Sequence, residues 1–464
     1  MPQKSRTEQL LNAYINGDDI SSFVPLSRNE QILKDMILGN EQTSSPQSRI
    51  ESLYQKLDEK IKQGSEDGNL DITQCFKKMF DESKSCEFLF YGGIDSYWDD
   101  KLYSYNNVSD EFLKIFFKDP NITNNVFNMS HMFFRLYNVT TIPRFNTSNV
   151  TNMSYMFSRC PKITSIPEMN TSKVTDMSHM FENCYKLTTI PEMDTSNVTN
   201  MSHMFKMGYD DPHNGDNSIS SLLIIPKMNT SKVTDMGYMF DHCLCLTSIP
   251  EIDTSNVTNM SSMFFYCRSL TSIPEMDTSK VTDMNYMFGQ CINITTIPKM
   301  NTSKVTNMDY MFEFCEKLTS IPEMDTSNVT NMNYMFHVCG SITTIPKIDM
   351  NNAKYVYDMF NGCSKLTYLK LLNIKVNLKI GSGTYDGHLI EKDCLIQIIS
   401  ELIDTGSSKT LTMGTINTAK LSDTYIKLLE DDGTGKYPFE VCESTDEGAM
   451  TITDYCTAKN WTLA

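Results

Sequence analysis

One dipeptide, Met-Phe, divides most of this chain into equal lengths. Its copies follow one another at steps of 24 residues, except for a single step of 35 between Met204 and Met239. The ten copies begin at Met132, Met156, Met180, Met204, Met239, Met263, Met287, Met311, Met335 and Met359. A unit of 24 residues is too short for two helices. Its repetition predicts a solenoid of ten coils, in which each coil packs on its neighbours.

The pattern inside one repeat predicts the path of a coil. The repeat reads M-x-x-M-F-x-x-C-x-x-[LI]-T-x-I-P-x-M-[DN]-T-S-[NK]-V-T-[ND]. Leu-Thr-x-Ile alternates like a short parallel strand, and we expect the following Pro to end it, because proline cannot donate to a ladder. The spacing of Met-x-x-Met-Phe is typical of one helical turn facing inward. Asx-Thr-Ser is typical of a corner, where side chains bond to nearby backbone.

Methionine and cysteine fall into columns of this repeat. Of the 32 methionines, 25 occupy three columns, which predicts a flexible apolar core. Eight cysteines lie four residues after the second Met of their repeat. Neighbouring thiols in stacked coils would lie close enough for disulfides, so distance alone does not exclude them. A zinc site is not expected, because no Cys-x-x-Cys pair is present. We interpret the column as buried free thiols, because we expect the chain to fold in a cytoplasm.

A different repeat precedes the solenoid. The pattern Ser-Arg-x-Glu occurs three times, and Ser followed three residues later by Glu is a capping box that opens a helix. We expect short helices near 5–16, 27–38 and 48–63. Each is too short to be stable alone, so they would either pack together as a small bundle or dock on a partner. The candidate anchor residues are Arg6, Glu8, Arg28, Glu30, Arg49 and Glu51.

These patterns divide the chain into four parts. We expect three helices in 1–66, an N-terminal cap in 67–128, the solenoid in 129–370 with an insertion near 207–217, and a C-terminal cap in 371–464. In the C-terminal cap, strands at 369–380 and 410–413 and a helix at 391–403 would cover the last coil, which a solenoid requires.

The repeat resembles a known family. The segments TIPEMDTSNVTNMSHMF at 189–205 and SIPEMDTSNVTNMNYMF at 320–336 are similar to BspA-type leucine-rich repeats, and the likeness covers about 129–370. It implies a right-handed parallel solenoid used for adhesion or recognition, without catalytic residues to carry over. The segments at 410–421 and 460–464 are similar to the ends of repeat proteins from gut phages. The N-terminal segment is similar to gut-phage structural proteins, which implies a virion anchor.

Two sets of positions are candidates for binding. The two residues that follow Met-Phe vary most from repeat to repeat, either because they face a ligand or because exposed positions drift freely. The candidate surface residues are Arg159, Asn183, His242, Phe265, Tyr266, Gln290, Phe314 and His337. The residue before the second Met is usually Tyr or His, which suits a glycan-stacking stripe or half-buried filler.

Charge and motifs limit the function. A net charge of −17 argues against nucleic acid and anionic membranes, and no apolar run is long enough for a signal peptide or a membrane span. No catalytic set, metal site or cofactor motif is evident in the sequence. The segment DDGTGK at 431–436 is not a phosphate loop, because it lacks the P-loop spacing.

The sequence therefore predicts an α+β repeat protein, a non-enzymatic virion component synthesised in the host cytoplasm. Its N-terminal helices would bind other virion proteins, and its solenoid would bind a host-surface glycan or protein. A homo-oligomer is compatible with helical anchors. The alternatives are a BspA-type adhesin on a bacterial cell surface and a cytosolic interaction scaffold.

Overall fold

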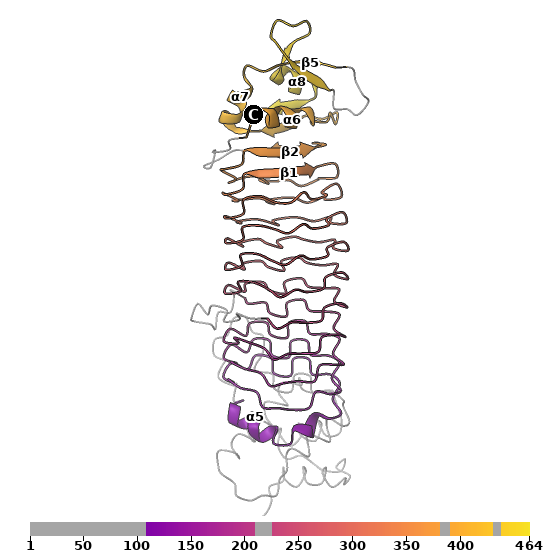
Figure 1. Ribbon diagram of the computed structural model, residues 1–464, viewed down its shortest axis with the longest axis vertical. Coiled ribbons are helices and arrows are strands. Elements are labelled where there is room, and N and C mark those ends of the chain that lie inside the picture. The colour runs from indigo at the N-terminus through magenta and orange to yellow at the C-terminus, as the bar shows by residue number, and fades with distance from the viewer. Residues whose placement is uncertain (1–107, 209–224, 381–389, 430–437) are drawn as a thin grey trace, which may run out of the picture. The chain divides into compact units, whose positions relative to one another are not determined.

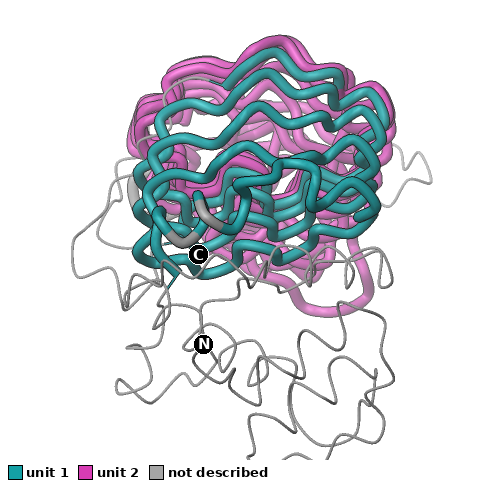
Figure 2. Tube along the Cα trace, turned by 90° about the horizontal axis from the view of Figure 1, so that it is seen from below, with its two compact units in different colours: residues 1–229 teal, residues 230–464 magenta. Residues whose placement is uncertain are grey.

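The structure is a computed structural model that describes residues 108–208, 225–380, 390–429 and 438–464 (Figure 1). The chain forms two compact units, residues 1–229 and 230–464 (Figure 2). Within each unit the backbone runs as coils laid on one another, joined by parallel bridges at the Asx residue before the first Met. The bridges link Asn128, Asn152, Asp176 and Asn200 in the first unit, and Asp235, Asn259, Asp283, Asn307, Asn331 and Tyr355 in the second.

Backbone hydrogen bonds between coils hold each stack together. The amide of Phe133 donates to the carbonyl of Met156 at 2.9 Å, and that of Phe240 donates to Met263 at 2.9 Å. Further bonds of the same spacing repeat along both units. They satisfy backbone groups that the coil buries, which would otherwise cost free energy. The described parts are therefore a repeat solenoid with the 24-residue period expected from the sequence.

The expected helical turn at Met-x-x-Met-Phe is wrong. The amide of Met132 donates to the carbonyl of Met129 at 3.2 Å, and Phe134 donates to His131 at 3.1 Å, so two tight turns overlap. His131 has φ of 56°, and a positive φ at the third residue is the geometry of a type II turn, not of a helix. The two methionines and Phe133 are nonetheless fully buried, because a three-residue spacing brings side chains together in either structure.

Stacked phenylalanines form the centre of each unit. In the first unit the centroids of Phe133, Phe157, Phe181 and Phe205 follow at 5.3–5.8 Å. In the second, those of Phe240, Phe264, Phe288, Phe312, Phe336 and Phe360 follow at 5.5–5.9 Å. The planes are within 14° of parallel. Offset stacking of this kind adds to the free energy gained by burying the rings.

The cysteine column lies beside these rings. All eight thiols of the column are fully buried and free. In seven coils the thiol donates to the carbonyl of the Phe in the preceding coil, at 3.0–3.2 Å. Burial raises the pKa of these thiols, to about 12 for Cys184 and Cys363. In most of these coils the Phe carbonyl also accepts from the amide of the Cys in its own coil, so the thiol is a second donor that links neighbouring coils.

The Asx-Thr-Ser corner is confirmed. The side-chain Oδ1 of Asn146 accepts from the amide of Ser148 at 2.8 Å, and Asp277 accepts from Ser279 at 2.9 Å. The Thr between them turns inward and donates to the next coil, as Thr147 does to the carbonyl of Asn170 at 2.9 Å. This corner thus closes one coil and ties it to the following one.

The strand expected in every coil is rare. Among the described residues it reaches strand length only as β1 (Thr344–Asp349) and β2 (Tyr368–Leu372), which pair in parallel. Elsewhere in the described coils the same segment makes at most a single bridge, as Thr141 does with Ser165, and in several coils it makes none. The expectation that Pro ends the strand is wrong at Pro346, which lies inside β1. A register shift between Ile345 and Ile348 leaves proline out of the paired positions.

Helix α5 (Asp110–Phe116) and the 3-10 helix η2 (Pro120–Thr123) precede the first coil. The ring of Phe117, just after α5, lies 6.1 Å from that of Phe133 and extends the phenylalanine stack. The expected helices of 1–66 and their anchor residues lie outside the described residues. So does most of the expected cap at 67–128, and so does the insertion apart from its first two residues.

The C-terminal part has more elements than expected. They are β3 (Leu378–Lys379), α6 (Lys392–Ser400), β4 (Lys409–Thr412), α7 (Gly414–Leu421), β5 (Tyr425–Leu428), β6 (Phe439–Cys442), β7 (Met450–Thr451), α8 (Ile452–Ala458) and β8 (Trp461–Leu463). A parallel sheet has the order β3-β4-β8, and an antiparallel one has the order β6-β5-β7. The helix near 391–403 and the strand near 410–413 are confirmed as α6 and β4. The strand expected at 369–380 is two strands, β2 and β3.

Candidate binding surface

Two positions of each coil have left-handed backbone. The residue before the second Met has φ of 44–59°, and the residue before the Cys has φ of 56–63° in most coils. This conformation is uncommon for residues other than glycine, and in a coil it reverses the chain direction sharply. The second position carries Arg159, Asn183, His242, Tyr266, Gln290 and Phe314, six of the eight candidate surface residues. The positions that vary most therefore lie at turns of the coil.

In the first unit, the column before the second Met is a ladder of stacked rings. The centroid of His131 lies 4.5 Å from that of Tyr155, Tyr155 lies 4.0 Å from His179, and His179 lies 4.1 Å from His203. The planes are within 13° of parallel. Burial, and then the nearby His179, lowers the pKa of both His131 and His203 to about 4. This ladder therefore consists mainly of neutral rings near pH 7.

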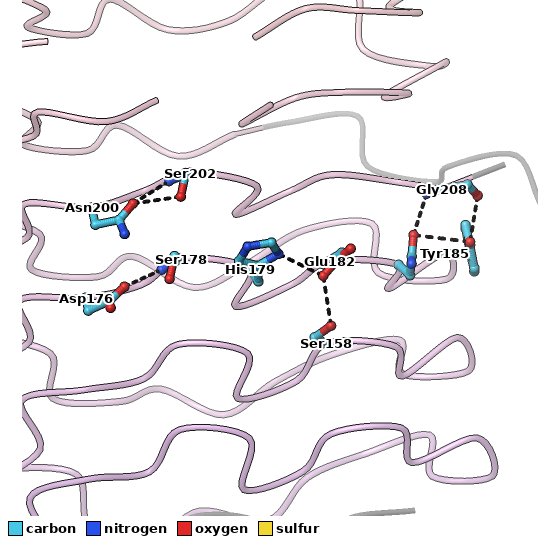
Figure 3. Close-up of polar contacts among 10 residues, drawn as sticks. Ser158, Asp176, Ser178, His179, Glu182, Tyr185, Asn200, Ser202 and Gly208 are labelled. Atoms are coloured by element: carbon cyan, nitrogen blue, oxygen red, sulfur yellow. Dashed lines mark hydrogen bonds and ion pairs between the residues drawn. The ribbon is translucent and has the colours of Figure 1, made fainter. Parts of the chain in front are cut away.

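His179 also has a carboxylate partner (Figure 3). Its Nδ1 lies 2.9 Å from Oε2 of Glu182, which also accepts from the hydroxyl of Ser158 at 3.2 Å. Burial raises the pKa of Glu182, but the hydrogen bond with His179 and the nearby positive charges together outweigh it, and the net pKa is lowered. Ser158 bonds to the carboxylate and not to the imidazole, so this geometry gives the serine no general base.

The second unit carries a tyrosine ladder in the same column. The rings of Tyr286 and Tyr310 stack at 4.4 Å, and those of Tyr310 and Tyr334 stack at 4.7 Å. Tyr357 meets Tyr334 edge-on at 5.3 Å. Tyr355 and Tyr357 are 60% and 63% exposed. We define the tyrosine face as Tyr286, Tyr310, Tyr334, Tyr355 and Tyr357.

The stacking limits what this face can bind. A sugar ring stacks on the face of an aromatic ring, but Tyr310 lies between two other rings and has both faces covered. Only ring edges and hydroxyls of the inner ladder can meet a ligand. Free ring surface remains at the exposed Tyr355 and Tyr357. A glycan-stacking stripe along the whole column is therefore not what this geometry offers.

The structure brings several candidate residues together. The ring of His242 stacks on Tyr266 at 4.5 Å, and Phe265 lies edge-on to both. Phe314 and His337 form a second pair at 5.4 Å. These side chains are half-buried, whereas we had expected exposed ones. Each pair lies beside the ladder column, because Phe265 contacts Tyr286 and His337 contacts Tyr334.

The remaining candidates have different environments. Asn183 is 7% exposed, and its Oδ1 accepts from the hydroxyl of Tyr185 at 3.2 Å and from the amide of Gly208, so this side chain stabilises the fold. The side chains of Arg159 and Gln290 are half-buried, and their amides donate to the next coil.

The tyrosine face also includes two residues that the sequence reasoning missed. Tyr355 and Tyr357 replace the Asx and the small polar residue found in other coils. The signal was present at 351–360, where the repeat pattern breaks down, but we interpreted it only as the approach of a cap.

One family model matches the chain. It is described as a Mycoplasma protein of unknown function, DUF285, and matches residues 105–218, 217–294 and 267–373, more than half of the chain. The chain belongs to the DUF285 family. No curated protein matches it. The BspA-like character of the repeat agrees with this membership, and the DUF285 match begins just before α5 and ends just after β2.

Two solved structures resemble this DUF285 chain distantly. One is a leucine-rich-repeat protein of T. pallidum, with 14% identity over 51% of this chain and 69% of that one, and a TM-score of 0.17. The other is the TLR13–ssRNA13 complex, with 10% identity, 66% and 49% coverage and a TM-score of 0.22. This chain thus spans about half the length of the second. Superposition at this level carries no argument about function.

Two further observations bound the chemistry of the DUF285 solenoid. No described helix is long and apolar enough to cross a membrane. Among the described residues, no group of three or more His, Cys, Asp and Glu is placed to hold a metal ion, so His179 and His203 stack without a third ligand. Stacked coils present a long side surface, which suits protein binding.

Proposed function

We propose that this DUF285 protein is a non-enzymatic binding protein of a phage virion, of the fibre, decoration or receptor-binding type. The observation that carries the binding role is the aromatic column beside variable side chains on the same turns of the coils. The core columns of Phe, Met and Cys build each coil, and the turn positions are free to differ. Aromatic side chains are frequent anchors of protein interfaces.

The virion location is supported by the N-terminal sequence. Three Ser-Arg-x-Glu segments resemble the start of gut-phage structural proteins, and short capped helices of this kind need a partner to pack on. In this proposal residues 1–66 attach the chain to other virion proteins. The solenoid then meets a host-surface protein or glycan.

A second candidate is a bacterial surface adhesin. The observation that favours it is the family itself, because the matching model is described by a Mycoplasma protein. The same binding surface would then face a host or neighbouring cell from the bacterial envelope. A cytosolic interaction scaffold is the third candidate and needs only the solenoid.

The location of the intact chain separates these candidates. An antibody against the full-length protein is used on purified phage particles, cell envelopes and cytosol from the same culture. The virion proposal expects a fixed number of copies per particle that survive washing in high salt. Recovery in the envelope of cells without particles supports the adhesin, and recovery in the cytosol alone supports the scaffold.

A further inference from the structure

Carboxylates lie beside the tyrosine face. Burial raises the pKa of Tyr286 and Tyr310, and the negative charges of Asp309 and Glu313 raise them further. Burial also raises the pKa of Asp309, and Glu313 and Asp283 add to this effect. Like charges are thus crowded on the same coils that carry the stacked tyrosines. This crowding costs free energy that an incoming positive charge would recover.

These carboxylates lack cationic partners in the structure. Within the described residues no lysine or arginine forms an ion pair with Asp283, Asp309 or Glu313, and Glu313 meets only His337 at 3.3 Å. The Oδ1 atom of Asp309 is buried without a hydrogen-bond partner among those residues. An acceptor of this kind normally has a donor in a native protein. Asn331 and Asn333 bond to the same carboxylate, and Oδ1 of Asp283 accepts from the amide of Asn285 at 3.0 Å, so neutral groups are the partners here. The three carboxylates therefore carry negative charge that no described lysine or arginine neutralises through an ion pair.

The aromatic rings beside these carboxylates can also bind a cation. Tyr355 and Tyr357 are the most exposed large hydrophobic residues of the described coils, and their ring faces can lie against a guanidinium or ammonium group. Stacked Tyr286, Tyr310 and Tyr334 are held rigidly by their neighbours, so little side-chain entropy is lost when a ligand binds them. The whole chain has a net charge of −17, which attracts a cationic partner at long range.

We propose that the tyrosine face, with Asp283, Asp309 and Glu313, binds a lysine- or arginine-rich segment of a partner protein. The proposal rests on the binding function proposed above and names the chemistry of the partner. Ammonium or guanidinium groups pair with the three carboxylates, and the tyrosine hydroxyls accept further hydrogen bonds. The exposed rings of Tyr355 and Tyr357 pack against the stems and charged groups of the segment.

The test uses the full-length protein and a labelled peptide of alternating lysine and serine, followed by fluorescence anisotropy at low and physiological salt. The comparison ligands are the same peptide with glutamine in place of lysine and a neutral oligosaccharide. We expect binding of the lysine peptide alone, weakened as salt rises because exposed charges are screened.

Two variants test the site. Asp309→Asn with Glu313→Gln removes two charges from the face, and Tyr355→Asn with Tyr357→Asn installs the residues that Asn331 and Asn333 supply one coil earlier. Each should weaken binding at least about tenfold. The control is Glu251→Gln with Glu275→Gln, which removes two exposed charges that follow Ile-Pro, away from the ladder column, and should leave affinity unchanged. Circular dichroism establishes that all variants are folded.

The outcomes are decisive for this partner chemistry. Equal loss in the control variant would mean that net charge alone attracts the peptide, and the proposal fails. Binding of the glutamine peptide or the oligosaccharide at the same site also overturns it. Absence of lysine-peptide binding overturns it as well. Each of these results leaves the binding function itself to be judged by the location of the intact chain.

Discussion

At the scale of single residues, the burial of the cysteine column could be predicted from the sequence, but the hydrogen bonds of its thiols could not. Its period predicted buried thiols, and the structure places them in the core. The hydrogen bond from seven of these thiols to the carbonyl of a Phe in the preceding coil could not be predicted from spacing. This bond depends on the direction in which the turn before the Cys sends the backbone. That turn requires a residue with left-handed backbone, which the residue types found there do not favour.

Removal of one such thiol should destabilise the solenoid. In Cys291→Ala the carbonyl of Phe264 loses the thiol donor but keeps the amide of Cys267 at 3.0 Å, so we expect a loss of about 0.5–1.5 kcal/mol in the free energy of unfolding. Urea unfolding followed by circular dichroism measures it. Cys245→Ala, a half-buried cysteine outside the column, is the matched control. Equal and small effects in both variants would show that the thiol hydrogen bond contributes nothing.

The histidines of the first ladder predict a pH dependence. The pKa of His131 and of His203 falls from 6.5 to about 4 on folding, so the unfolded chain binds protons first as pH falls. Stability should therefore be lost as pH decreases from 6.5 toward 4. His131→Tyr with His203→Tyr, the residue that Tyr155 supplies in the same column, should remove more than half of the difference between pH 7.5 and pH 5. An unchanged difference would contradict this cause.

At the scale of the elements, the sequence predicted which residues face inward better than it predicted their backbone. Met129, Met132 and Phe133 are buried as expected, but through overlapping turns instead of a helical turn. The spacing of three residues does not distinguish the two. The elements α7 and α8 and the antiparallel sheet were missed because they lie outside the repeat, where no second copy reinforces a weak pattern.

One turn allows a direct test of the coil geometry. Gly362 has φ of 84°, and a Cβ there would lie 2.9 Å from the Cα of Val338. Gly362→Ala should therefore cost about 1–3 kcal/mol of stability, from backbone strain and the close contact together. In Gly340→Ala, the added Cβ has no neighbour closer than 3.9 Å, and we expect a change near zero. Thermal unfolding of the two variants compares them, and similar midpoints would refute the left-handed turn.

At the scale of the whole molecule, the repeat was enough to predict a solenoid and the type of family. The residues of the candidate site could be predicted only in part. The candidate residues His242, Phe265 and Tyr266 do cluster. From the sequence we expected the neighbouring aromatic column to be a glycan-stacking stripe or half-buried filler. The sequence does not show that its rings stack on and cover one another. Tyr355 and Tyr357 were missed because we interpreted the loss of the repeat pattern at 351–360 as the end of the solenoid. It also places two exposed aromatic side chains on the surface of the last coil.

The central claim is that this DUF285 solenoid binds a partner through the tyrosine face. Co-sedimentation of the full-length protein with purified host envelopes tests it most directly, with Tyr355→Asn/Tyr357→Asn and Glu251→Gln/Glu275→Gln proteins beside the unchanged one. We predict that the unchanged and Glu251/Glu275 proteins sediment with the envelopes and that the Tyr355/Tyr357 protein stays in solution. Sedimentation of all three alike, or of none, would contradict the claim.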